Sequence, residues 1–149
     1  MKLRVYLDTS VFSAYFDERM PERQAQTREF WERLAEFEVA TCSGAREEME
    51  AVEDVGRRDA VLGLLSVAAI LPITDEMRQL AGRYVAAGTL PAAATGDALH
   101  VAVAALTRQD ILVSWNWNHL VNRRTRAAVN HANVLWGLPA LEIAAPPQV

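Results

Sequence analysis

Short apolar runs alternate along the chain with longer stretches of mixed polarity. Each run spans only a few residues, which is too short for a stable helix and typical of strands buried on both faces of a parallel sheet. We therefore expect strands at 3–8, 39–42, 70–73 and 111–114, with a further short strand at 141–143.

The stretches between these runs have helical features. Apolar residues recur at three- and four-residue spacing, as Phe30, Leu34 and Phe37 do. After a short helix or turn at 11–16, we expect helices at 24–37, 44–54, 57–68, 74–88, 95–107 and 122–134. Strands alternating with helices predict an α/β fold with a mostly parallel central sheet of about four to five strands flanked by helices.

Local signals refine this outline. Ser43, Thr74 and Thr95 each stand where they could cap a helix. The stretch 95–107 is apolar nearly all round, which predicts a central helix. We expect one domain over 1–149, in which 144–149 form a loose tail.

Composition agrees with one folded domain. The 149 residues are 51% hydrophobic and 23% charged, and the net charge of -4 argues against a protein that coats nucleic acid. Cys42 is the one cysteine, so it has no partner for an internal disulfide or a cysteine metal site. A signal-peptide pattern is absent, and no apolar run reaches the ~20 residues of a membrane helix, so we expect a soluble cytoplasmic protein without a membrane partner.

Asp8 is the first candidate functional residue, because it follows the most apolar strand directly. Open parallel sheets bind ligands at the carboxyl ends of their strands. Asp8 could instead simply cap the next helix, although Thr9 or Ser10 could do so without a charge near the core.

Glu48 is the second candidate, because its helical neighbours three and four residues away are all small or apolar. Glu47 has mixed neighbours and Glu50 has charged ones. Glu48 is therefore predicted to point toward the core, where an unpaired carboxylate is costly.

Asp97 is the third candidate, at the first turn of the most apolar helix. Its alternative role is to stabilise the positive end of the helix dipole. Together, Asp8, Glu48 and Asp97 would repel one another without a cation, and oxygen ligands of this kind suit Mg²⁺ or Mn²⁺. The closely spaced His and Cys ligands that zinc prefers are missing.

Four segments in this order resemble the PIN-domain ribonucleases, in particular the VapC-like toxins of toxin–antitoxin pairs. They are YLDTSVF, EEME, GDALHVAVA and LVSWNWNHL, and the resemblance covers nearly the whole chain. It implies a single PIN-like domain that cleaves RNA with Mg²⁺ or Mn²⁺ held by acidic residues. The family's first three acids fall on Asp8, Glu48 and Asp97, with Glu47 the alternative if the helix register shifts by one.

The family's fourth acidic position, commonly Asp, falls on Asn116. Asn can coordinate through its amide oxygen or bind a metal-bound water, but it adds no charge. Three carboxylates can hold one cation, so cleavage with two metal ions is possible without being implied.

Other residues near these positions have open roles. Thr9, Ser10 and Ser114 could hydrogen-bond the metal ligands. His100 could orient Asp97 or contact substrate, or be structural. The RNA-binding candidates are Arg123, Arg124, Arg126 and His119, although the arginines could equally form a solvated face and His119 could serve the turn. Trp115 and Trp117 could stack on bases or pack in the interior.

We therefore expect a Mg²⁺- or Mn²⁺-dependent endoribonuclease, the toxin of a toxin–antitoxin pair. The resemblance further implies a homodimer bound by a cognate antitoxin. The alternative is a catalytically weakened PIN-like module that binds RNA or a protein partner. A receiver domain is disfavoured because Lys2 is the only lysine, and a DxDxT phosphatase because Ser10 replaces the second Asp.

Overall fold

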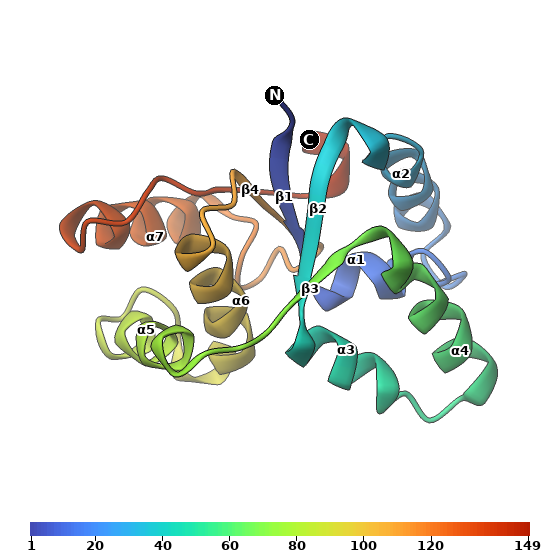
Figure 1. The fold of residues 1–149 in the computed structure, drawn as a ribbon, viewed down its shortest axis with the longest axis horizontal. Helices are drawn as coiled ribbons and strands as arrows, with labels where there is room; N and C mark the ends of the chain where they lie inside the picture. Colours follow the sequence, from blue (N-terminus) through green and yellow to red (C-terminus); the bar gives the residue numbers. More distant parts are fainter.

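A parallel sheet of five strands forms the centre of the computed structural model, which describes residues 1–149 (Figure 1). The strands, in the spatial order β3-β2-β1-β4-β5, are all parallel to their neighbours. Their bounds are Leu3–Leu7 for β1, Phe37–Cys42 for β2, Ala69–Leu71 for β3, Ile111–Val113 for β4 and Glu142–Ala144 for β5. The predicted α/β fold and strand number are confirmed.

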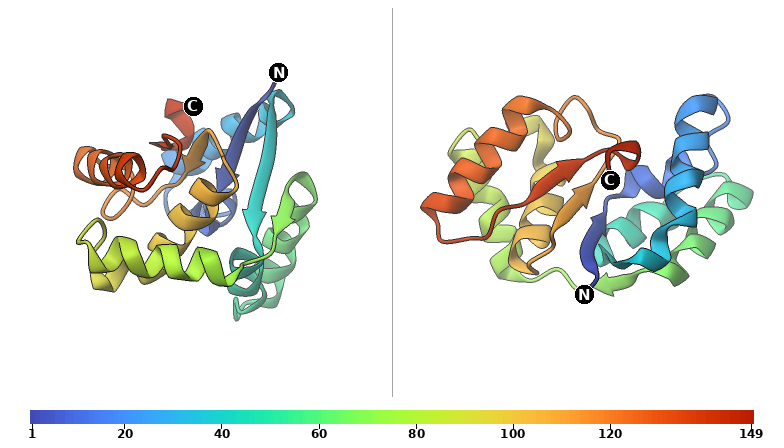
Figure 2. Two further views of the ribbon diagram at one scale, coloured as in Figure 1. Left: turned by 60° about the vertical axis from the view of Figure 1, so that its left-hand side comes forward. Right: turned by 90° about the horizontal axis from the view of Figure 1, so that it is seen from above.

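Seven α-helices cover the sheet. They are α1 (Thr9–Ala14), α2 (Pro21–Glu32), α3 (Ser43–Glu50), α4 (Val55–Gly63), α5 (Asp75–Ala86), α6 (Thr95–Leu106) and α7 (Arg123–Leu135). Helices α1 to α4 lie on one side of the sheet and α5 to α7 on the other, as Figures 1 and 2 show. This division follows from right-handed crossovers, because the chain first proceeds from β1 toward β3 and then returns past β1 to β4.

The strand order therefore reverses between β1 and β4, which makes this the topological switch point of the sheet. In open α/β sheets, ligands bind outside the carboxyl ends of the strands at such a point. Val5, Tyr6 and Leu7 of β1 are fully buried, and the residues of β4 are buried as well. Two central strands thus present their carboxyl ends side by side from within the core.

The second predicted strand begins earlier than expected. The helix predicted over 24–37 is α2, which runs from Pro21 to Glu32 and is followed by a 3-10 turn at Leu34–Glu36. Phe37 pairs with Leu3 in the sheet and stacks on Phe30 at 6.2 Å between ring centres. The apolar spacing that suggested a longer helix is produced by packing between a helix and a strand.

Helix capping was predicted correctly at one of three positions. Thr74 accepts a hydrogen bond from the backbone N–H of Met77 and caps α5. Ser43 instead lies inside α3, and Thr95 lies inside α6 with its hydroxyl donated to the carbonyl of Ala92. Both predicted caps are wrong because each helix begins one residue earlier than expected: extended Cys42 precedes Ser43, and the 3-10 turn Ala92–Ala94 leads directly into Thr95.

The last residues pack against the body of the protein and are not the loose tail that the sequence suggested. Ala144 and Ala145 are buried, and Pro146–Gln148 form a 3-10 turn. The guanidinium of Arg33 in the α2–β2 connection donates to the carbonyl of Val149 at 2.8 Å. The composition APPQV did not reveal this because the contacts come from distant segments.

Helix α6 is the central helix that its sequence predicted. Seven of its residues are buried, including the run from Val101 to Ala105. None of the helices combines the length and the apolar character that crossing a membrane requires.

A buried polar pair links α5 to α7 and can be tested directly. The hydroxyl of Tyr84 donates to Oδ1 of Asn133, both residues are fully buried, and burial raises the pKa of Tyr84 to about 12. Tyr84→Phe should lower the free energy of unfolding by about 1–3 kcal/mol, because Oδ1 of Asn133 loses its donor. Urea denaturation measures the change. Tyr15→Phe, at a half-buried tyrosine, is the control, and an equal loss in both variants would contradict the prediction.

Candidate functional site

An acidic pocket opens at the carboxyl ends of β1 and β4, at the switch point of the sheet. Its volume is ≈ 330 Å³. Residues from β1 and α1, from α3, from α6 and its preceding turn, and from the segment after β4 line it: Asp8, Thr9, Ser10, Glu48, Ala93, Gly96, Asp97, His100 and Asn116. All three predicted acids and Asn116 therefore face one pocket, whereas Glu47 does not.

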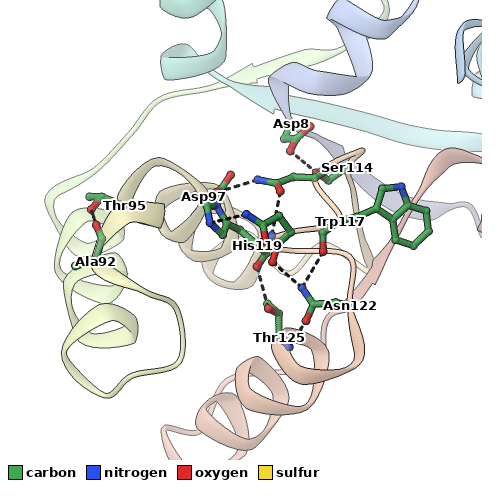
Figure 3. Close-up of polar contacts among 11 residues, drawn as sticks. Asp8, Ala92, Thr95, Asp97, Ser114, Trp117, His119, Asn122 and Thr125 are labelled. Carbon is green, nitrogen blue, oxygen red and sulfur yellow. Dashed lines mark hydrogen bonds and ion pairs between the residues drawn. The ribbon is translucent and has the colours of Figure 1, made fainter. Parts of the chain in front are cut away.

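Asp8 is the buried base of this pocket, only 4% exposed. Its Oδ1 accepts hydrogen bonds from the backbone N–H and the hydroxyl of Ser10. Its Oδ2 accepts one from Ser114 at 2.6 Å (Figure 3). Burial raises the pKa of the Asp8 carboxyl, while nearby His100 and the two serine hydroxyls act in the opposite direction. Asp8 is thus the N-cap of α1 as well as the buried acid of the pocket.

Asp97 is held by residues from the segment that follows β4. Its Oδ2 accepts a hydrogen bond from Nδ2 of Asn116 at 3.1 Å and lies 3.0 Å from Nδ1 of His119 (Figure 3). Oδ1 of Asn116 in turn accepts from the backbone N–H of His119. Asn116 therefore acts as a donor to an acid, a role that an aspartate at this position could not fill.

Glu48 lies at the rim of the pocket and not in the core, which corrects the prediction that it points inward. Its side chain is 58% exposed, because α3 buries Ala45 and Met49 on either side of it. Its Oε1 lies 3.9 Å from Nε2 of His100. Small neighbours along the helix mark the side facing other elements, but they do not distinguish the core from the edge of a pocket.

His100 connects Glu48 to the core. Its Nδ1 lies 2.7 Å from the hydroxyl of Tyr6 in β1 and 4.0 Å from the thiol of Cys42. Burial disfavours the charged imidazole, but the Cys42 thiol and the acids Asp8 and Glu48 outweigh it and raise the pKa of His100. His100 does not bond Asp97, so its suggested role in orienting that carboxylate is wrong; His119 occupies that position instead.

The donor set of the pocket fits a hard divalent cation in its chemistry. Carboxylates are the ligand type that Mg²⁺ and Mn²⁺ prefer, three of them line the pocket, and buried Asp8 lacks a positive partner in direct contact. No group of three or more His, Cys, Asp or Glu side chains stands in a metal-binding geometry. Asp97 faces His119 and Glu48 faces His100. The three acids therefore share a pocket, but their oxygens are not yet arranged around a common point as metal ligands are.

The three hydroxyl residues predicted beside the ligands differ in their contacts. Ser10 and Ser114 bond Asp8, and each also links the segment after β4: Ser10 Oγ accepts from Trp115 N–H and Ser114 Oγ from Asn116 N–H. The hydroxyl of Thr9 is buried without a hydrogen-bond partner at the pocket wall.

The RNA-binding candidates separate into distinct environments. Arg126 donates to the carbonyl of Ile143 at 2.8 Å and to Gln148, so it fastens α7 to β5 and the C-terminal turn. Arg123 and Arg124 are exposed, and Arg124 lines a hollow together with His119.

The two candidate tryptophans also separate. Trp115 is buried and donates its indole N–H to Thr27, which excludes it from stacking on a base. Trp117 is 44% exposed. The sequence WNWN, in which both tryptophans are followed by Asn, does not indicate which of the two is buried.

Sequence reasoning missed two features of the site. Tyr6 contacts His100 from inside β1, and the sequence signal was only that a polar aromatic residue precedes Leu7 and Asp8 on the buried strand. The pairing of His119 with Asp97 had no signal along the chain, because 22 residues separate them.

The fold and this pocket together define a class: a doubly wound α/β protein with an acidic site at its switch point. The PIN domain family matches residues 5–119, which span the pocket from β1 to His119. The chain belongs to the PIN-domain family.

Three solved structures with a similar fold come from VapC or VapBC proteins. VapBC2 from Rickettsia felis, bound to a promoter DNA fragment, has a TM-score of 0.58 at 12% identity, over 96% of this chain and 98% of that one. VapC20 from Mycobacterium tuberculosis, a sarcin-ricin loop cleaving toxin, has a TM-score of 0.56 at 15% identity. The match covers 72% of this chain and 86% of that one. DNA-bound VapBC from Salmonella typhimurium has a TM-score of 0.52 at 17% identity, over 97% of this chain and 98% of that one. At these identities the likeness concerns the fold, and no curated protein sequence matches the chain significantly.

The burial of Asp8 predicts that this carboxylate lowers the free energy of unfolding of the metal-free protein. Asp8→Asn should raise the free energy of unfolding by about 1 kcal/mol or more at pH 7 without divalent metal, because an amide costs less to bury than a carboxylate. Since the folded-state pKa is raised, the neutral acid is favoured in the folded protein, and the advantage of Asn should shrink as the pH falls toward the ordinary value of 3.8.

Thermal and urea unfolding of both proteins across pH measure this effect. Asp59→Asn on exposed α4 is the matched control, and it should change stability by less than about 0.5 kcal/mol. If Asp8→Asn destabilises the protein at pH 7, the serine hydrogen bonds outweigh the burial cost and the prediction is wrong.

Proposed function

We propose that this protein is a divalent-metal-dependent endoribonuclease, the toxin of a toxin–antitoxin pair. The observation that carries the proposal is the meeting of Asp8, Glu48 and Asp97 in one pocket at the switch point of a PIN-family chain. Asp8 directly follows β1, and Glu48 and Asp97 lie in α3 and α6, so the folded chain brings the acids together over long sequence separations.

Asp8, Glu48 and Asp97 would hold the cation, Mg²⁺ or Mn²⁺, with Asn116 as a neutral neighbour. When bound, such a cation lowers the pKa of water and stabilises charge on a phosphate under attack. Ser10 and Ser114 orient the Asp8 carboxylate through both of its oxygens.

His119 and His100 are each paired with one acid, Asp97 and Glu48 respectively. Both imidazoles therefore lie where they would hold these carboxylates in the absence of a cation.

The partners follow from the same family resemblance. VapBC structures pair a toxin with an antitoxin, and two of the similar structures carry this assembly on DNA. We propose a cognate antitoxin for this protein, a homodimeric assembly and a cytoplasmic site of action on RNA.

The alternative proposal is a PIN-like module with weakened catalysis that binds RNA or a protein partner. It is favoured by Asn116 in the fourth acidic position and by the lack of a completed group of metal ligands. Calorimetric titration with Mg²⁺ distinguishes the two proposals, because a weakened site should take up the cation poorly.

The nuclease proposal is tested with purified protein and a mixed single-stranded RNA. Cleavage should require Mg²⁺ or Mn²⁺, stop on chelation, and fall at least about 100-fold in Asp8→Asn, Asp97→Asn and Glu48→Gln, because each change removes a metal-binding charge. Glu47→Gln is the matched control, since Glu47 is the exposed neighbour of Glu48 outside the pocket. Equal cleavage by the protein and by Asp8→Asn would refute the assignment.

Asn116 gives a second test of the metal site. Asn116→Asp places a carboxylate against Asp97 and removes the 3.1 Å hydrogen bond, so the metal-free protein should lose about 1–3 kcal/mol of stability. Mg²⁺ should then raise the melting temperature of this variant more than that of the parent, because four acids bind the cation more tightly. Gln79→Glu at an exposed position of α5, outside the pocket, is the control, and an equal Mg²⁺ response in all three proteins would contradict a metal at this pocket.

A further inference from the structure

The two aspartates of the acidic pocket already use some of their oxygens. Each carboxylate oxygen has two lone pairs, which can accept hydrogen bonds or bind a cation. Oδ2 of Asp97 is contacted by Nδ2 of Asn116 at 3.1 Å and by Nδ1 of His119 at 3.0 Å (Figure 3). Both lone pairs of Oδ2 are therefore used, and Oδ1 of Asp97, which has no hydrogen bond, is the oxygen left for a cation.

The direction of these two hydrogen bonds follows from the groups around them. The backbone N–H of His119 can only donate, and it donates to Oδ1 of Asn116 at 3.0 Å. The amide of Asn116 therefore turns its NH₂ group, and not its oxygen, toward Asp97. An ionised carboxylate can only accept, so Nδ1 of His119 carries the proton that faces Oδ2. Two N–H donors thus point at the same oxygen of Asp97.

Asp8 is occupied in a similar way. Its Oδ1 accepts from both the backbone N–H and the hydroxyl of Ser10, and its Oδ2 accepts from Ser114 alone. Both serine oxygens accept from the backbone after β4, so their hydroxyl protons remain for Asp8. Asp8 therefore offers one lone pair, on Oδ2. Neither aspartate can bind cations through both of its oxygens without losing hydrogen bonds.

The groups that remain free suit one hydrated cation. They are a lone pair of Asp8, Oδ1 of Asp97 and the exposed carboxylate of Glu48. Mg²⁺ usually keeps several of its waters in proteins and is bound by only a few carboxylates. The hydroxyl of Thr9, which is buried at the pocket wall without a hydrogen-bond partner, is available to one of those waters.

The charge of the pocket leads to the same number of cations. Three carboxylates line the pocket, and no Arg or Lys does. One divalent cation is fully offset by these carboxylates, whereas two such cations carry more positive charge than three carboxylates can offset. In two-metal sites the ions are ~3.5–4 Å apart, where their repulsion is strong unless enough negative ligands surround them.

We propose that Asn116 and His119 limit this pocket to one divalent cation. They hold Asp97 through Oδ2, so that it binds the cation through Oδ1, and their N–H groups occupy the side from which a second cation would reach Oδ2. The proposal rests on the proposed metal-dependent function. It deepens that function by stating the number of cations and by making His119 a positioning residue for Asp97.

The number of bound cations is measured with Mn²⁺ by electron paramagnetic resonance, in which the signal of free Mn²⁺ is lost on binding. The parent protein should bind one Mn²⁺ per chain, after subtraction of the weak binding to surface carboxylates that Asp8→Asn retains. The spectrum of bound Mn²⁺ is a second readout, because two ions ~3.5–4 Å apart would couple magnetically.

Asn116 is tested with three variants. Asn116→Asp should raise the number of bound Mn²⁺ to two, because it removes an N–H donor from Oδ2 of Asp97 and adds a fourth carboxylate. Asn116→Ala removes the donor without adding charge, and Gln79→Glu adds a carboxylate on α5 outside the pocket. Both should still bind one ion, and a single ion in Asn116→Asp would contradict the role of Asn116.

His119 is tested in the Asn116→Asp background. Adding His119→Ala should tighten the second Mn²⁺ about 10-fold, because an N–H donor no longer competes for Oδ2 of Asp97. Adding His119→Asn keeps an amide N–H near the position of Nδ1, so the affinity should stay close to that of Asn116→Asp alone. Both changes keep the backbone N–H that holds residue 116. Equal affinities in the two double variants would refute the positioning role.

The outcomes separate this proposal from the proposed function. A protein that binds one Mn²⁺ but never cleaves RNA would leave the single-cation site standing and refute the nuclease. Two coupled Mn²⁺ ions in the parent would overturn the single-cation site and leave the nuclease intact, and no Mn²⁺ beyond that bound by Asp8→Asn would overturn both. Cooperative urea unfolding shows that each variant is folded, and the count in the parent decides the proposal even where a variant is not.

Discussion

The structure around the site depends on burying one carboxylate at the end of β1. Asp8 is 4% exposed, and it is held by Ser10 from the following helix and Ser114 from the end of β4. A buried charge is tolerated only when its hydrogen-bonding capacity is met, so these two serines are constrained by Asp8. Both serines also accept from the backbone after β4, so the same contacts fix the segment that carries Asn116 and Trp117.

The other two acids are arranged differently, each facing a histidine. Asp97 pairs with His119 at 3.0 Å, and Glu48 faces His100 at 3.9 Å. The acids of the site therefore differ in exposure: Asp8 is buried and held by hydrogen bonds, whereas the side chain of Glu48 is 58% exposed. An exposed side chain on a helix can change its rotamer at little cost, so Glu48 is the acid of the three whose carboxylate can move most freely.

The fold was largely predictable, and the errors occurred where distant segments meet. The strand pattern predicted the parallel sheet, but Phe37 was placed in a helix because its spacing from Phe30 is also helical. The C-terminal turn was expected to be loose, because its contacts with Arg33 and Arg126 cannot be inferred from local composition. Asp8, Glu48, Asp97 and Asn116 were selected from the sequence and share a pocket, yet the degree of exposure of Glu48 was not predicted.

The sequence by itself determined the alternation of strands and helices, the polar residues at strand ends, and the helical faces, because these depend on short-range periodicity. The tertiary structure decided which polar groups pair: Asp97 with His119 and not His100, Arg126 with β5 and not with solvent, and Trp115 with Thr27 while Trp117 stays exposed. Such pairings follow from how separate elements pack, and a periodic pattern along one segment contains no information about the side chains of another.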